Sequence, residues 1–289
     1  MKIDNFNQMG FDKYIYVIAE IGINHNGSVD IAKKLIDNAV ETGCDAVKFQ
    51  KRDIETVYAK DILDQPRESP WGKTQREQKQ GLEFSLNQYE EIDKYCKEVN
   101  IDWFASSWDK KSQLEMRRFN FKYNKIASAM ATNLDFVEFV ASERIPTFAS
   151  TGMTEMKDIE KIVDIFQKQS CELMLMHTVS TYPSLESDLN LKCITMLKDK
   201  FKLPVGYSGH EVSVSPSIVA ASLGASAIER HITLDRSMYG SDQSASLQKE
   251  GFRQLVSICR KIPTMLGDGE KVIIEGEREI ANKLRYWNK

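Results

Sequence analysis

The chain has 289 residues, of which 42% are hydrophobic and 28% are charged, a composition typical of a soluble globular protein with a substantial core. Its formal net charge of −3 argues against a basic surface of the kind that binds nucleic acid. The five cysteines are scattered along the chain, which favours reduced thiols over a disulfide framework.

The N-terminal stretch MKIDNFNQMGFDK lacks the apolar core of a secretory signal. No apolar run elsewhere approaches the roughly 20 residues that are needed to span a bilayer. We therefore expect a cytoplasmic protein that binds neither membranes nor nucleic acid.

Short apolar runs rich in β-branched and aromatic residues alternate with longer stretches of helical period, which is typical of βα units around a parallel sheet. The first expected helix, residues 28–43, has Ser28 as its N-cap and Gly43 as its C-cap. The pattern predicts an α/β fold, a (β/α)8 TIM barrel. The eight expected strands span residues 14–22, 45–50, 102–108, 123–128, 146–151, 171–178, 203–210 and 226–233.

One connection departs from this alternation of strands and helices, because the segment 51–87 is too long and too polar for an ordinary βα loop. We interpret this segment as a cover over the active site. No linker divides the chain, so residues 1–289 are predicted to form one catalytic domain, with the barrel at about 14–265. The extension 266–289 is too short for a further domain and is expected to pack as a C-terminal helix.

Polar side chains gather where the expected strands end, which is where TIM barrels carry their chemistry. Lys48 and Lys125 lie in or next to apolar strands, where an ammonium group needs an anionic partner. Five serines accompany them, and together they predict a pocket for a phosphate and a carboxylate. Taken singly, each serine could be a turn former and each lysine could reach solvent. The serines are Ser106, Ser128, Ser150, Ser180 and Ser208.

Two of the four histidines, His210 and His231, end consecutive expected strands. Neighbouring strand ends would bring both imidazoles to one divalent metal ion, with water and substrate completing an open coordination shell. Each histidine considered alone could instead be structural. His177 is expected in the core or behind the site, and His25 could serve the site or shape its turn.

Glu20 ends a segment suited to a buried strand, so its carboxylate must be paired, protonated or functional. Two interpretations remain open. It could pair with Lys48 on the adjacent strand, or it could orient a water molecule or a substrate hydroxyl.

Seven motifs follow one another along the chain: AEIGINHNG, VKFQ, NKIAS, STGM, VSTYP, GYSGH and ERHITLDR. In this order they resemble the N-acetylneuraminate (sialic acid) synthase family from about residue 15 to about residue 280. The resemblance implies a transferase that condenses phosphoenolpyruvate with an aldose, usually N-acetylmannosamine or a relative. The products would be a nine-carbon 2-keto-3-deoxy acid, a nonulosonate, and inorganic phosphate. It also implies a homodimer.

The resemblance assigns roles to individual residues. His210 and His231 would hold Mn²⁺, or alternatively Mg²⁺ or Co²⁺, which polarises the aldehyde. Glu20 would orient the water that captures the cationic C2, or would shuttle its proton. Gln50, Tyr182 and Asp242 match positions that contact the sugar. Phosphoenolpyruvate would lie among Lys48, Ser106, Lys125, Ser128, Ser150, Ser180 and Ser208.

Three features depart from the family pattern. Met130 stands where well-known members carry a glutamate, and Ser180 stands where bacterial members have an asparagine. The small C-terminal antifreeze-like domain, which supplies an arginine to the N-acyl group of the sugar, is not part of this sequence.

These departures leave alternatives open. One is a synthase for another ulosonic acid, such as an octulosonate or a non-acylated nonulosonate. Another is an aldolase with Lys48 or Lys125 as a Schiff-base nucleophile. A third is a non-catalytic barrel that binds a sugar acid.

Overall fold

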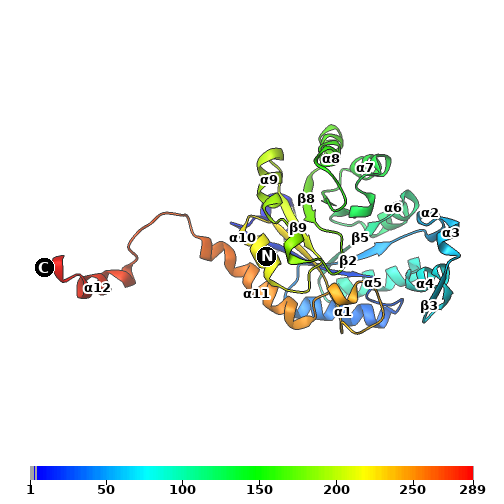
Figure 1. The fold of residues 1–289 in the computed structure, drawn as a ribbon, viewed down its shortest axis with the longest axis horizontal. Helices are drawn as coiled ribbons and strands as arrows, with labels where there is room; N and C mark the ends of the chain where they lie inside the picture. Colours follow the sequence, from blue (N-terminus) through cyan, green and yellow to red (C-terminus); the bar gives the residue numbers. More distant parts are fainter. Residues whose placement is uncertain (1–2, 4, 289) are drawn as a thin grey trace.

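The computed structural model describes residue 3 and residues 5–288 of the chain, so residues 1, 2, 4 and 289 of the predicted domain lie outside it. Eight parallel strands form a closed barrel in the order β1-β10-β9-β8-β7-β6-β5-β2 (Figure 1). The predicted TIM barrel and all eight of its strands are therefore confirmed. The strands are β1 (Tyr16–Gly22), β2 (Ala46–Lys51), β5 (Asp102–Ser107), β6 (Asn124–Ile126), β7 (Thr147–Ser150), β8 (Leu173–Thr178), β9 (Val205–Gly209) and β10 (Ala227–His231).

Helices cover the outside of the barrel. The first of them begins and ends as predicted, because the Ser28 side chain accepts a hydrogen bond from the Ile31 N–H and Gly43 adopts the left-handed conformation at φ 81°. The helices that follow barrel strands are α1 (Val29–Thr42), α5 (Leu86–Glu98), α6 (Lys110–Met116), α7 (Leu134–Ala141), α8 (Met156–Lys168), α9 (Lys192–Phe201), α10 (Ser215–Ser222) and α11 (Lys249–Leu266).

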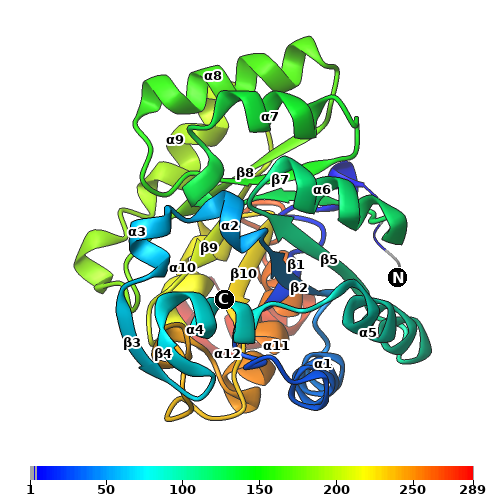
Figure 2. The same cartoon turned by 90° about the vertical axis from the view of Figure 1, so that its right-hand side faces the viewer.

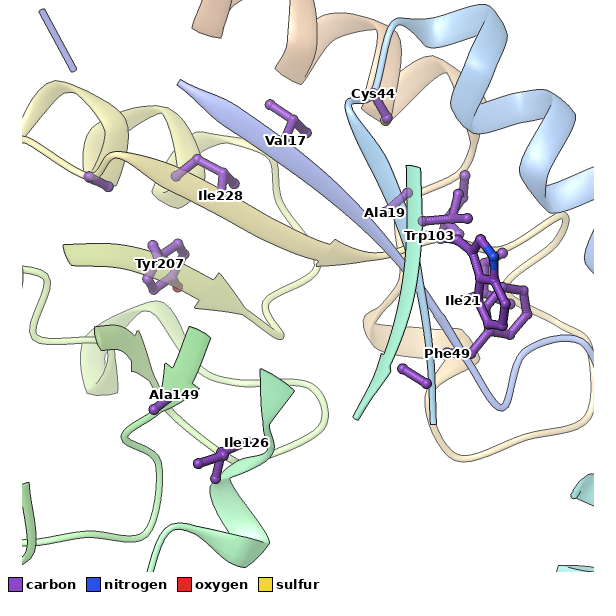
Figure 3. Close-up of a cluster of buried hydrophobic side chains, with 14 of the residues drawn as sticks. Val17, Ala19, Ile21, Cys44, Phe49, Trp103, Ile126, Ala149, Tyr207 and Ile228 are labelled. Carbon is purple, nitrogen blue, oxygen red and sulfur yellow. The ribbon is translucent and has the colours of Figure 1, made fainter. Parts of the chain in front are cut away.

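Alternation along each strand sorts the side chains into two sets. On β1, Val17, Ala19 and Ile21 belong to the apolar layer between strands and helices, part of which is drawn in Figure 3. Their neighbours Tyr16 and Ile18 belong to a second apolar cluster that fills the barrel. Because the period is two, Glu20 continues the inward set at the C-terminal end of the strand.

The lower part of the barrel is filled by aromatic rings. The Phe148 ring centre lies 5.2 Å from that of Tyr123 and 5.9 Å from that of Phe104. Phe6, in the short 3-10 helix η1 (Phe6–Gln8), adds its ring 4.9 Å from Phe148. The N-terminal segment thus closes the bottom of the barrel. The polar side chains inside the barrel lie at its opposite end.

The long connection after β2 folds into short elements that lie in front of the barrel strands in Figure 2. They are α2 (Ile54–Val57), α3 (Lys60–Leu63), the antiparallel pair β3 (Pro66–Ser69) and β4 (Gly72–Thr74), and α4 (Gln75–Leu82). A Cβ atom at Gly27, which follows β1, would lie 2.1 Å from the Gly81 carbonyl oxygen, and one at Gly81 would lie 2.1 Å from the Trp71 ring. The two glycines thus let the connection approach the loop that follows β1 closely.

The C-terminal extension forms a helix but does not pack on the barrel. Helix α12 (Glu275–Leu284) has no buried residue and lies at the end of an extended segment in Figure 1. Ile274, Ile280 and Leu284 are all more than half exposed. The expectation that this helix packs is therefore wrong, because its apolar side chains meet no partner surface. Within the described residues, no helix combines the length and apolar character that a membrane span requires.

We expect Phe148→Ala to lower the free energy of unfolding by about 3–5 kcal/mol, because the fully buried ring would leave a cavity among four aromatic neighbours. Urea unfolding followed by circular dichroism measures the change. Leu114→Ala is the control, since this side chain is 50% exposed and should change the free energy by less than about 0.5 kcal/mol. Equal effects of the two substitutions would contradict the packing described above.

Candidate active site

A cavity of about 160 Å³ opens at the C-terminal ends of the barrel strands, above the aromatic layer. Inward-facing positions and the loops that follow the strands line it. All of the predicted site residues except Asp242 contribute to its wall: Glu20, Lys48, Gln50, Ser106, Lys125, Ser128, Ser150, Ser180, Tyr182, Ser208, His210 and His231. The structure thus brings together predicted side chains from seven of the eight barrel strands, and from the loop that follows β8, although their roles stay predictions.

Four charged side chains form a buried network at the floor of the cavity. The Lys48 ammonium lies 2.8 Å from the Glu20 carboxylate and 3.6 Å from that of Glu229. Lys125 Nζ lies 3.0 Å from Glu229, and the Ser208 hydroxyl donates to Glu229 at 3.2 Å. Each of the four charged side chains is at most 6% exposed, so their charges must compensate one another.

Sequence reasoning missed Glu229, although a signal for it exists. Glu229 stands two residues before His231 on β10, so strand alternation places both side chains on the same face. Only the last residue of that strand was considered at the sequence level. The structure makes Glu229 the one carboxylate that contacts both lysines of the described network.

Burial and neighbouring charges shift the pKa values of these side chains in opposite directions. Burial raises the pKa of Glu20 to about 7, against the opposing effect of the Lys48 ammonium. Burial alone would also raise the pKa of Glu229, but Lys125 and Lys48 lower it to about 2. Burial would lower the pKa of Lys48, yet the two carboxylates outweigh it and raise this pKa. Burial lowers the pKa of Lys125, against the opposing effect of the Glu229 carboxylate. Of the two carboxylates, Glu20 is therefore the one that can change its charge near neutral pH.

The serines surround the lysines with hydroxyl groups. Ser128 Oγ accepts a hydrogen bond from the Gly152 N–H at 3.2 Å, whereas the buried Ser180 hydroxyl has no partner within the described part of the chain. A Cβ atom at Gly152 would lie 2.2 Å from Ser180 Oγ and 2.7 Å from Ser128 Oγ. Only glycine at this position lets both hydroxyls approach the same space. An unpartnered buried hydroxyl in the same cavity as two ammonium groups suits an anionic ligand.

The two histidines at the strand ends lie side by side, with ring centres 5.4 Å apart. His210 Nδ1 lies 2.7 Å from the Val179 carbonyl oxygen, so this nitrogen carries the proton and Nε2 keeps its lone pair. His231 Nδ1 is buried without a hydrogen bond, 3.7 Å from an Asp242 carboxylate oxygen. The Tyr182 ring packs 4.0 Å from that of His210.

The histidine pair fits a divalent ion, since both rings are held in the form that binds metals. Burial lowers the pKa of His210 to about 4 and also lowers the pKa of His231. Neutral imidazole is a common ligand of transition metals, and the Val179 carbonyl fixes the tautomer of His210. Within residues 3 and 5–288 no cluster of three His, Cys, Asp or Glu side chains could hold an ion. Water or substrate would have to supply further ligands, and metal binding stays a prediction.

Three other residues singled out in the sequence lie outside the cavity wall. His177 lies 2.7 Å from the Leu189 carbonyl oxygen through Nε2, the structural role expected for it. His25 stacks on Phe84 at 3.9 Å and accepts the Gly27 N–H, so it shapes its turn. Met130 packs against the apolar layer between strands and helices. Met130 therefore does not line the cavity, and Ala127 and Ala129 form this part of its wall.

A second cavity of about 370 Å³ continues outward from the first, and the two share Gln50, Trp108 and Tyr182 as walls. Asp242, the remaining predicted residue, lines this outer cavity, as do side chains of the connection after β2. The segment predicted to cover the site thus forms one wall above it (Figure 2).

Comparison with known proteins agrees with this arrangement. The NeuB family model matches residues 35–271 of the chain. The N-acetylneuraminate-9-phosphate synthase of Drosophila melanogaster is 40% identical over 94% of this chain and 75% of its own length. The N,N'-diacetyllegionaminic acid synthase of Legionella pneumophila is 33% identical over 98% of this chain and 82% of its own.

Among solved structures, the sialic acid synthetase of Leptospira borgpetersenii in complex with citrate superposes with a TM-score of 0.83. That protein is 28% identical, and the match covers 95% of this chain and 94% of the other. Fold, sequence and family model agree along nearly the whole length. The chain therefore belongs to the NeuB family of synthases and is an enzyme.

Proposed function

We propose that the enzyme condenses phosphoenolpyruvate with an aldose, N-acetylmannosamine or a related hexosamine, to give a nonulosonate and inorganic phosphate. The observation that carries the proposal is the buried pair Lys48 and Lys125 beside the unpartnered hydroxyl of Ser180, within one cavity with the histidine pair. The names of the relatives, synthases of sialic and legionaminic acid derivatives, support the same class of product.

Phosphoenolpyruvate would bind on the floor of the inner cavity. Its phosphate and carboxylate would meet Lys48 and Lys125, which in the ligand-free enzyme contact only the carboxylates of Glu20 and Glu229 within the described network. The serine hydroxyls would donate to the same oxygens. Charge-assisted hydrogen bonds to side chains as deeply buried as these two lysines are stronger than the same bonds in water.

Carbon–carbon bond formation comes first in the proposed reaction. C3 of the enolpyruvate attacks the aldehyde carbon, and the aldehyde oxygen takes a proton to become a hydroxyl. Water then adds to the cationic C2, and the tetrahedral intermediate loses inorganic phosphate to leave the ketone. Glu20, hydrogen-bonded to the Gln50 amide at 2.8 Å, would orient this water and accept its proton. A divalent ion held by His210 and His231, Mn²⁺ or alternatively Mg²⁺ or Co²⁺, would supply Lewis acidity at the aldehyde oxygen.

Other ulosonic acids remain within this proposal, because the inner cavity recognises phosphoenolpyruvate and the aldehyde end of the acceptor. A panel of aldoses tested with phosphoenolpyruvate and Mn²⁺, followed by phosphate release, identifies the acceptor. Absence of release with every aldose would favour a barrel that only binds sugar acids. A homodimer in the cytoplasm belongs to the same proposal, and light scattering of the purified protein tests the dimer.

A Schiff-base mechanism is the competing chemistry. It requires a neutral amine. The carboxylates around Lys48 raise its pKa, whereas burial lowers the pKa of Lys125 against the opposing effect of Glu229, so Lys125 is the lysine that such a mechanism would use. Treatment with borohydride in the presence of pyruvate distinguishes the two mechanisms. A trapped adduct together with turnover that resists a chelator would contradict the metal-assisted condensation.

Glu20→Gln should lower kcat by about 100-fold or more, because the amide cannot accept the proton of the attacking water. In the wild type, kcat/KM should fall as pH drops through about 7, where the carboxylate becomes protonated. His210, with its pKa lowered to about 4, titrates well below this range. The pH profile of the variant should lack the limb near pH 7, and persistence of that limb would exclude Glu20 as its source.

His231→Ala should reduce bound metal and lower kcat by about 100-fold or more, since one of two imidazole ligands is lost. Metal content after dialysis is measured by inductively coupled plasma mass spectrometry. His177→Gln serves as the control, because His177 lies outside the cavity and contacts the Leu189 carbonyl. Unchanged metal content in the His231 variant would contradict the ligand assignment.

Lys125→Ala should raise the KM for phosphoenolpyruvate by about 10- to 100-fold, because one charge-assisted bond to the anion disappears. Steady-state kinetics with the acceptor held at saturation measure the change. Lys168→Ala, at an exposed position of α8, should leave this KM unaltered. The assignment fails if the Lys125 variant retains the wild-type value.

A further inference from the structure

A buried ion pair lies behind the two histidines, on the outer side of the barrel wall. Arg230 stands between Glu229 and His231 on β10, so strand alternation directs its side chain away from the cavity. Its Nη1 lies 2.8 Å from a carboxylate oxygen of Glu211, the residue that follows His210. Both side chains are at most 1% exposed, and neither lines the inner or the outer cavity. Neither residue has a part in the proposed reaction.

Further hydrogen bonds extend this ion pair into a network. Arg230 Nη1 donates to the Ser217 hydroxyl and to the Ser213 carbonyl oxygen, both at 2.9 Å. Nη2 donates to the backbone carbonyl oxygen of Glu211. The Glu211 carboxylate accepts the Tyr207 hydroxyl at 2.9 Å and the Ser217 hydroxyl at 3.2 Å. The network therefore joins β10 to β9, to the loop that follows β9, and to α10.

His210 and His231 lie just beyond the last paired residues of their strands. The pairing of β9 with β10 ends one residue before each histidine. The His231 carbonyl accepts the Leu247 N–H at 2.8 Å, whereas the His210 carbonyl accepts the Ser184 N–H at 3.0 Å. The two backbones are thus held from different sides of the site. The ion pair links the residue before His231 to the residue after His210 and so spans this gap.

Stability alone does not account for an ion pair at this place. Arg230 stands between Ile228 and Ile232 on the outward face of the strand, and both isoleucines belong to the apolar layer between strands and helices. An apolar pair of similar volume would often stabilise such a layer equally well, because buried charges lose their hydration. Gly209 also serves the pair, since a Cβ atom there would lie 2.6 Å from Glu211 Oε2. The sequence thus accommodates a polar network where apolar packing would suffice.

We propose that Arg230 and Glu211 form a positioning pair that fixes His210 relative to His231, and thereby sets the affinity of the two imidazoles for a divalent ion. This inference rests on the metal binding proposed above and adds two residues that touch neither the ion nor the substrate. Bonds between metal and nitrogen are short, about 2.0–2.1 Å for Zn²⁺, so a small displacement of one ring weakens its bond. Groups that orient metal-binding histidines from behind change metal affinity by about 10- to 100-fold.

The test removes both charges at once, in the variant Arg230→Met/Glu211→Gln. Removal of one partner alone would leave a buried charge uncompensated and destabilise the fold, whereas the double variant keeps similar volumes and no charge. Isothermal titration calorimetry with manganese chloride should give a Kd about 10- to 100-fold above that of the wild type. With Mn²⁺ at saturation, the KM for phosphoenolpyruvate should stay unchanged, because Lys48 and Lys125 keep their places.

Two further variants control for a general loss of structure. Arg260→Met is the matched control, because Arg260 Nη2 lies 2.8 Å from Asp45, directly before β2 and so at the opposite end of the barrel. It should lower the free energy of unfolding in urea and leave the Kd for Mn²⁺ unchanged. Tyr207→Phe removes one hydroxyl bond to Glu211 and keeps the ring, so it should fold and raise this Kd by about 2- to 10-fold.

An unchanged Kd for Mn²⁺ in a folded double variant would overturn the inference. If circular dichroism shows that the double variant is unfolded, an unchanged Kd in the Tyr207 variant overturns it instead. Crystal structures separate the inference from the proposed reaction. The double variant should show one imidazole ring displaced from the arrangement in which the ring centres of His210 and His231 lie 5.4 Å apart. A wild type that binds no Mn²⁺ would reject metal binding, and unmoved rings in the variant would reject the positioning pair.

Discussion

Compensation among four buried charges is the constraint on which the rest of the site depends. Lys48 and Lys125 are almost completely buried, so the fold must place Glu20 and Glu229 against them. These side chains come from four different barrel strands, β1, β2, β6 and β10. The network therefore fixes the positions of the strand ends before any substrate arrives. An anionic substrate would exchange one set of negative partners for another, with little rearrangement of the lysines.

Because side chains alternate along each strand, the inward positions can be followed from one end of the barrel to the other. They change from apolar side chains at the bottom to polar side chains at the top. The inward positions of β1 read Tyr16, Ile18 and Glu20, from aromatic to aliphatic to charged. The shorter strand β7 shows the same order, because the apolar Phe148 is followed at the next inward position by the polar Ser150. Apolar contacts at the bottom stabilise the barrel, and the polar layer above them carries the site.

Much of this arrangement could be predicted from the sequence, because periodicity and caps are local signals. Apolar runs identify the strands, and Ser28 with Gly43 identifies the limits of the first helix. The polar residues at the strand ends then lie around one cavity, because the strands form a closed barrel. Glu229 was missed because it stands inside a strand, and alternation rather than position would have revealed it.

The remaining features depend on contacts between distant parts of the chain. Phe6 closes the barrel from a segment that has no strand or helix pattern of its own. Arg67 and Lys79 line the same cavity only because the long connection after β2 folds back over the strand ends. Whether α12 packs depends on a partner surface, and the amphipathic pattern of a helix does not specify one.

The contact between Gly27, Gly81 and the Trp71 ring has a consequence for how this enzyme could diversify. Neither glycine lines either cavity, yet any larger residue at these positions would wedge the connection away from the barrel. Such a change would displace Arg67 and Lys79 together while leaving the floor of the inner cavity intact. Residues that touch neither cavity can thus reshape the outer cavity, while the charged network on the floor of the inner cavity keeps its geometry.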